Sequence, residues 1–152
     1  VLMLTNDKAL IPALLRRLND LREKYQIVVV GLPEWEEMEM DINYLHQLNA
    51  HFFTPWFVDY SDPEVVRFIS SFRDRYIGEP ELARYAYLGY DLTAYFLEAL
   101  YSFGPGFLNC IPDFTKKGLS NNFRFQQQNG GGYENTSITV YRLADFRKET
   151  VK

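Results

Sequence analysis

Short apolar segments alternate with helical segments in the first part of this chain, and this alternation limits its fold more than any other feature. VLML (1–4), QIVVVGL (26–32) and HFFTPWF (51–57) are rich in β-branched and aromatic residues, which is typical of strands. Leucines recur every three or four residues up to about Tyr25, and INYLHQLN (42–49) has the length of a short helix. Strands that alternate with helices predict a mostly parallel sheet covered on both faces. We therefore expect an α/β, Rossmann-like fold with three αβα layers.

Two longer helices are predicted after the third strand. In DYSDPEVVRFISSFRDRYIG (59–78), Ser61 or Asp62 is the expected N-cap and Pro63 occupies the first helical position. Residues 84–103 are apolar over most of the helix surface, which predicts that this second helix is buried on most of its sides.

A β-hairpin is predicted near the C-terminus. FRFQQQ (123–128) and TSITVYRL (136–143) alternate like strands, and NGGG (129–132) lies between them as a turn. A chain of 152 residues with 47% hydrophobic residues suits one domain with a sizeable core, so we expect residues 1–152 to form a single domain.

Several classes of function are disfavoured by the composition. The net charge is −4 and no block of Lys and Arg stands out, which argues against a nucleic-acid partner. Cys110 is alone, His46 and His51 lack a second pair of metal ligands, and no catalytic motif is present, so we expect no enzyme, cofactor or metal site. The chain begins at Val1 directly with an apolar strand, so we expect it to be a piece of a longer protein.

A binding site is expected where the three strands end. In open α/β sheets, ligands bind beyond the carboxyl ends of the strands. The predicted ligand-binding residues at these ends are Thr5, Asn6, Pro33, Glu34, Trp35, Trp56, Phe57 and Tyr60.

Each of these groups also has a structural interpretation, and both remain open at this point. Glu34 and Trp35 either start a helix and pack on their own domain, or bind an ammonium or hydroxyl group and stack on a ligand. The aromatic residues of 56–60 either line the same cleft or anchor the next helix. Thr5 and Asn6 either cap a helix or present free N–H groups to an anion.

The central part of the chain resembles a known superfamily. A D-P-x-V-x-x-F helix with a later Y and G-x-P (62–80), followed by G-Y-D (89–91), is similar to type I periplasmic binding proteins such as the leucine/isoleucine/valine-binding proteins. The closing segment FRFQQQNGGGYENTSITVYRL (123–143) also fits. By this resemblance, we interpret G-Y-D as a structural motif. Gly89 would allow close packing, and Tyr90 and Asp91 would fix neighbouring loops.

This resemblance implies most of one lobe of a two-lobed protein that captures a small polar solute, such as an amino acid or a short peptide, between its lobes. The missing N-terminal lobe would complete the site, and membrane transporter subunits would be partners. The implied location is the periplasm or cell envelope of a bacterium. The alternative is a cell-envelope interaction or scaffold domain of the same fold without a transported ligand.

A narrower resemblance concerns VGLPEWEEM (30–38), YLGYD (87–91) and GGGYENTSITVY (130–141). These segments are similar to a Bacteroidetes branch in which some members carry a LysM peptidoglycan-binding module, so peptidoglycan is a further expected partner. An incomplete sheet would expose an edge or an apolar face, and this predicts self-association of the chain as a homodimer.

Overall fold

The structure is a computed structural model that describes residues 1–80, 84–144 and 146–151. These residues form two compact units, which are described separately below. Unit 1 contains Val1–Thr54 and the residues from Thr139 onward, and unit 2 is Pro55–Ile138. The single domain expected over residues 1–152 stays a prediction.

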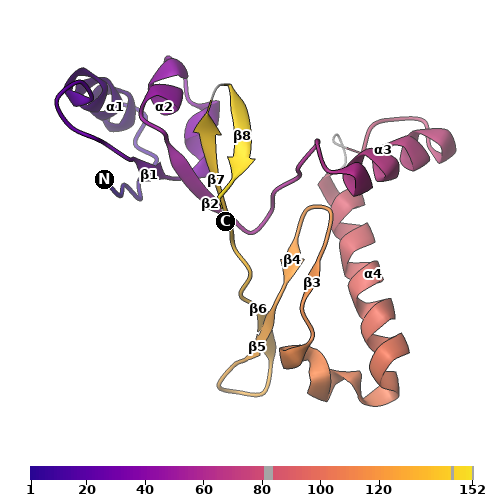
Figure 1. Ribbon diagram of the computed structural model, residues 1–152. Coiled ribbons are helices and arrows are strands. Elements are labelled where there is room, and N and C mark those ends of the chain that lie inside the picture. Colours follow the sequence, from indigo (N-terminus) through magenta and orange to yellow (C-terminus); the bar gives the residue numbers. More distant parts are fainter. Residues whose placement is uncertain (81–83, 145, 152) are drawn as a thin grey trace. The chain divides into compact units, whose positions relative to one another are not determined.

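Unit 1 is built on a four-stranded mixed sheet (Figure 1). Its strands, in spatial order, are β1 (Val30–Gly31), β2 (His51–Thr54), β7 (Thr139–Ala144) and β8 (Arg147–Thr150). β1 and β2 are parallel, whereas β2 with β7 and β7 with β8 are antiparallel. The fold therefore mixes helix and strand as predicted, but the mostly parallel sheet is not confirmed, because β7 returns to the sheet in the opposite direction.

The first apolar segment contributes only a parallel bridge between Leu2 and Val30. The helix after it, α1 (Leu10–Leu21), buries Ile11 and Leu15. The Asp7 carboxylate accepts hydrogen bonds from the N–H groups of Ala9 and Leu10, both at 2.9 Å. The acceptor at the start of α1 is thus Asp7 rather than the expected Thr5 or Asn6, because its carboxylate reaches the free N–H groups of the first turn.

Two further short helices belong to unit 1. A 3-10 helix, η1 (Pro33–Glu37), follows β1, and α2 (Asn43–Gln47) precedes β2 at the position predicted for a short helix. α2 buries Leu45, and α1 contacts α2.

Unit 2 contains two helices, a long 3-10 segment and two small hairpins (Figure 1). Its elements are α3 (Pro63–Arg75), α4 (Arg84–Phe103), η2 (Gly104–Asp113), β3 (Lys116–Lys117), β4 (Asn122–Phe123), β5 (Phe125–Gln127) and β6 (Tyr133–Asn135). The Asp62 carboxylate accepts a hydrogen bond from the N–H of Glu64 at 2.9 Å, and Pro63 begins the helix, so this predicted N-terminus is confirmed. α3 ends at Arg75, three residues before the end of the segment 59–78 in which the helix was predicted.

α4 has the predicted bounds but not the predicted burial. Its fully buried positions are Tyr87, Tyr95 and Ala99, with Asp91 almost fully buried among them, and they recur every four residues. Large apolar side chains on its other faces stay exposed, including Tyr85, Leu97 and Tyr101. The expectation of burial on most sides is therefore wrong for the described residues, since only one face packs within unit 2.

The hairpin turn at residues 129–132 is confirmed, but its second strand is not the one predicted. β5 pairs with β6, and the register joins Phe125 to Asn135 and Gln127 to Tyr133. The stretch predicted as the partner, 136–143, instead supplies β7 of the other unit. Polar residues in β6 gave no alternation signal, whereas the apolar alternation of 139–143 was strong and suits the central strand β7.

Aromatic rings fill both cores. In unit 1, Phe52 packs against Trp35 and Tyr141, with ring centroids at 6.2 and 5.3 Å. In unit 2, the Tyr95 ring lies 4.8 Å from Phe123 and 5.3 Å from Phe125. Within the described parts of the chain, no helix combines the length and the apolarity needed to cross a membrane.

Candidate functional site

Two of the predicted binding loops meet at one edge of the unit 1 sheet. Thr5 follows the bridged Leu2, and Trp35 follows β1, so both lie past the carboxyl ends of parallel segments. The indole Nε1–H of Trp35 donates a hydrogen bond to the Thr5 carbonyl oxygen at 2.8 Å. This bond brings the two loops together, whereas their contact with a ligand stays a prediction.

Trp35 itself lies in the core rather than at the surface. Its side chain has 0% exposure, and a methyl group placed on Gly31 would lie 2.1 Å from the indole ring. Gly31 thus lets the ring pack directly on the backbone of β1. A side chain without exposed surface has no face on which a solute could stack, so we assign Trp35 the packing role.

The neighbouring Glu36 fixes η1 to the sheet. Its carboxylate accepts a hydrogen bond from the Tyr141 hydroxyl at 2.5 Å and pairs with Lys148 at 2.9 Å. Burial, together with the negative charge of Glu36, raises the pKa of Tyr141 far above its usual range. The sequence analysis missed this contact, because no local pattern joins residues that are 105 positions apart.

The exposed polar groups at this edge are Asn6 and Glu34, while Thr5 and Pro33 are partly exposed. Because Trp35 and Glu36 hold η1 in place, the Glu34 carboxylate is presented on a fixed segment. A carboxylate in such a place can accept hydrogen bonds from an ammonium or hydroxyl group.

The other three predicted binding residues belong to unit 2. Trp56 is partly buried and packs against the core cluster of unit 2, which consists of Val58, Val65, Tyr87 and Leu119. The N–H of Phe57 donates a hydrogen bond to the Ser120 carbonyl at 2.8 Å, and Tyr60 is 51% exposed. The anchoring interpretation therefore holds for Trp56. A ligand contact stays a prediction for Phe57 and Tyr60.

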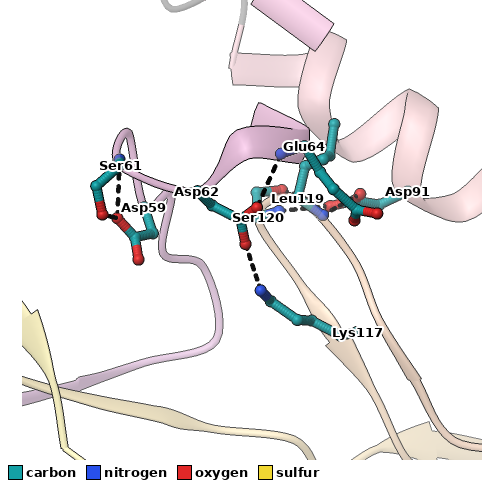
Figure 2. Close-up of polar contacts among 8 residues, drawn as sticks. All are labelled: Asp59, Ser61, Asp62, Glu64, Asp91, Lys117, Leu119 and Ser120. Carbon is teal, nitrogen blue, oxygen red and sulfur yellow. Dashed lines mark hydrogen bonds and ion pairs between the residues drawn. The ribbon is translucent and has the colours of Figure 1, made fainter. Parts of the chain in front are cut away.

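Unit 2 contains a buried carboxylate that organises a turn (Figure 2). Asp91 is 2% exposed and accepts hydrogen bonds from the N–H groups of Leu119 at 2.6 Å, Ser120 at 2.8 Å and Asn121 at 3.0 Å. The Ser120 hydroxyl donates a fourth bond at 2.8 Å. Gly118 is required beside it, because an added Cβ would lie 2.6 Å from the Asp91 carboxyl carbon.

These contacts bear on the earlier interpretation of the G-Y-D motif. The role of Asp91 in fixing a neighbouring loop is confirmed, because the loop is the turn between β3 and β4. Close packing at Gly89 is wrong, since an added Cβ there would meet no atom within 4 Å. Tyr90 is half exposed, and its ring lies 5.0 Å from that of Phe68.

An open cavity of about 320 Å³ lies between α3, α4 and the turn held by Asp91. Two ion pairs link the β3 lysines to the helices, Lys116 to Glu98 and Lys117 to Asp62 (Figure 2 shows the second). The hydrogen bond from Lys117, with that from the Glu64 N–H, holds the pKa of Asp62 below its usual value. The same pair raises the pKa of Lys117. The sequence analysis missed this cavity, because three separate elements form its wall.

Metal ligation has no support in the part of the chain that the structure describes. No group of three or more His, Cys, Asp or Glu side chains there could hold a metal ion. His46 instead packs against Phe146, with ring centroids 4.6 Å apart.

Comparison with known proteins gives a fold but no family. No family model and no curated protein matches the sequence. The structure is similar to a crystal structure of a putative branched-chain amino acid ABC transporter from Rhodospirillum rubrum, with a TM-score of 0.53, 16% identity and coverage of 95% of this chain and 42% of that chain. This likeness shows a periplasmic binding protein fold, as the resemblance implied.

Two structures of an ABC transporter substrate-binding protein from Desulfitobacterium hafniense, one in complex with Leu, give TM-scores of 0.44 and 0.45. Their sequences are 18% and 17% identical to that of this chain. Each match covers 90% of this chain and 39% of the solved chain. The chain thus spans about two fifths of the length of the solved structures it resembles. The narrower resemblance to a LysM-bearing Bacteroidetes branch gains no support from these structures.

Proposed function

We propose that this chain is part of a solute-binding protein that serves an ABC transporter. The observation that carries the proposal is the fold shared with the putative branched-chain amino acid ABC transporter over 95% of the chain. The ligand would be a small polar molecule such as an amino acid or a short peptide, held in an interlobe cleft without covalent chemistry. Transporter subunits would be the partners, and the periplasm or cell envelope would be the location.

The edge formed by Thr5, Asn6 and Glu34 is the part of the site that unit 1 would contribute. It lies beyond the carboxyl ends of two parallel segments, which is where α/β folds bind ligands. Glu34 would accept a hydrogen bond from the ammonium or hydroxyl group of the solute. Trp35 would support this edge from within the core rather than touch the solute.

This assignment is tested by comparing Glu34→Gln with Glu37→Gln. Both residues are exposed and lie in η1, so the two variants remove the same charge from the same segment. Amino acids and short peptides are titrated into the chain, and into any longer protein that contains it, while backbone amide NMR signals are followed. We expect shifts at Asn6 and Glu34, with affinity lowered about tenfold by Glu34→Gln only, the loss of one charge-assisted hydrogen bond. Equal affinity in both variants would contradict this role of Glu34.

A second candidate function is a cell-envelope interaction domain that has kept the fold without a transported ligand. The burial of Trp35 favours this candidate, because the largest side chain at the predicted edge fills space within its own unit. Binding to isolated peptidoglycan in a sedimentation assay, together with no response to the solute panel, would support it. The reverse pair of results would support solute capture.

A further inference from the structure

One face of α4 is apolar and exposed. Its most regular part is a stripe of five positions, which we call the α4 stripe: Gly89, Leu92, Phe96, Leu100 and Phe103. Residues three or four positions apart lie on the same side of a helix, so these five positions line one face over about 21 Å. The glycine is exposed, and the four large side chains are 36% to 45% exposed.

The described residues of α4 place no charge on this face. Between Tyr85 and Phe103, the charged residues are Asp91 and Glu98 only. Asp91 is buried, and its carboxylate holds the turn after β3. Glu98 points to another side of the helix and is paired with Lys116. An exposed helix face that carries large apolar side chains and no charge indicates a surface for docking.

The spacing of the α4 stripe is the same when it is read in either direction. The steps between neighbouring positions are three, four, four and three residues, so Phe96 lies at the centre. A second α4 that runs antiparallel, with a twofold axis at Phe96, would place the partner's Leu100 opposite Leu92. It would also place the partner's Phe103 opposite Gly89, where an added Cβ would meet nothing within 4 Å. The space at the glycine can accept that ring, so the stripe is complementary to itself.

The exposed surface is large enough for a weak dimer. Tyr85 and Leu97 flank the stripe and are 79% and 61% exposed. With about 200 Å² for each large side chain, the stripe and these two residues offer on the order of 600 Å² per copy. Two copies would bury about 1,200 Å², which is the lower limit for a specific interface, so we expect dimerisation at micromolar rather than nanomolar concentration.

We propose that the α4 stripe binds the same stripe of a second copy of the chain, as an antiparallel helix pair. The positive end of each helix dipole then lies beside the negative end of the other, which is electrostatically favourable. The α4 stripe is thus the apolar face that accounts for the self-association expected from the sequence. The interface lies wholly in unit 2 and does not depend on the solute site proposed at Glu34.

Sedimentation velocity of the full chain, from micromolar to submillimolar concentration, tests the proposal. We expect the wild-type chain to shift from monomer to dimer over this range. Leu100→Glu should weaken dimerisation at least about tenfold, because the pair would bury an uncompensated charge. Tyr101→Glu is the matched control. It adds the same charge one position further on, at a residue that is 93% exposed and lies outside the stripe, and it should leave dimerisation unchanged. Circular dichroism shows whether each variant is folded.

A mixture of two variants tests the antiparallel register. Leu92→Lys and Leu100→Glu should each stay monomeric alone. In a mixed pair, the new ammonium of the first variant would face the new carboxylate of the second, and the two unchanged leucines would face each other. Mixing the two variants should therefore restore the dimer. A parallel pair would instead place position 92 opposite position 92, and mixing would restore nothing.

Several results would overturn the proposal. They are a wild-type chain that is monomeric throughout the range, a dimer that Leu100→Glu leaves intact, an equal loss with Tyr101→Glu, and a mixture that remains monomeric. A longer protein that contains this chain and stays monomeric over the same range would also overturn it, because the stripe would then be covered within one polypeptide.

Discussion

The indole N–H of Trp35 donates a hydrogen bond to the carbonyl oxygen of Thr5, across 30 positions of sequence, at 2.8 Å. The bond joins the loop after the first apolar segment to the loop after β1. It therefore fixes the edge of the sheet to which we assign the proposed solute site. The ring can take this position only because residue 31 has no side chain.

The first prediction follows from that close approach. Gly31→Ala places a methyl group within 2.1–2.5 Å of three indole carbons, so the ring or the strand must move. We expect the free energy of unfolding to fall by about 2 kcal/mol, a typical effect of overpacking. Urea denaturation measures this change in the free energy of unfolding.

Gly89→Ala is the matched control. Its methyl group meets nothing within 4 Å, and the better helix propensity of alanine should stabilise α4 by up to about 1 kcal/mol. Equal effects at the two glycines would contradict the packing described here.

A second prediction concerns Asp91. Asp91→Asn keeps the size of the side chain but replaces one acceptor oxygen by a donor NH₂ group, which would face N–H groups of the turn after β3. We expect a loss of about 2–3 kcal/mol, since buried donors lose their partners. The amides of Leu119, Ser120 and Asn121 should also exchange their hydrogens faster in the Asp91→Asn variant. Asp59→Asn, at an exposed turn, is the control and should leave these amides protected. Unchanged exchange in Asp91→Asn would argue against the role given to this carboxylate.

A third prediction concerns alkaline pH and Tyr141. Its pKa is raised in the folded protein by burial and by Glu36, while the unfolded chain ionises near the usual value of 10.0. The stabilisation is therefore fully present below about pH 10 and decreases as the pH rises above it. Tyr141→Phe should cost about 1.5 kcal/mol at pH 8, through the lost bond to Glu36, and less at pH 11. Urea unfolding at both pH values measures this. The exposed Tyr25→Phe should show no such pH dependence, and a constant cost of Tyr141→Phe would contradict the assignment.

A fourth prediction concerns acid pH and the pair of Asp62 with Lys117. The pKa of Asp62 is lowered, so the pair stabilises the fold above the usual value of 3.8 and loses this effect as the pH falls through the lowered value. Asp62→Asn keeps a capping side chain but loses the charge. It should cost less than about 1 kcal/mol at pH 7 and nothing at pH 2. Asp62→Ala removes the cap as well and should keep a cost at both pH values. A cost of Asp62→Asn that is the same at pH 7 and at pH 2 would show that the ion pair contributes nothing.

Local sequence patterns predicted the elements that depend on local chemistry. Asp62 and Pro63 mark the start of α3, the bounds of α4 follow from its apolar residues, and NGGG forms the turn between β5 and β6. The edge at Thr5 and Trp35 was predictable too, because it needs only the rule that parallel strands end on the same side. The start of α1 was not, because Asp7 competes with two other residues able to cap.

Contacts between residues far apart in the sequence could not be predicted from local patterns. Nothing local indicates that residues 139–144 pair with β2 in the opposite direction, so the sheet was expected to be mostly parallel. The same limit hid the bond between Glu36 and Tyr141 and the cavity around Glu64 and Arg67. The burial of Trp35 also depends on a tertiary contact. A Trp next to a Glu occurs both in cores and at binding edges, so the local sequence does not distinguish the two.

Solute capture is tested most directly by isothermal titration calorimetry of this chain, and of any longer protein that contains it, with a panel of amino acids and short peptides. The account predicts saturable 1:1 binding of at least one member of the panel, with affinity reduced by Glu34→Gln and unaffected by Glu37→Gln. No heat of binding across the panel, with the fold shown intact by circular dichroism, would contradict it.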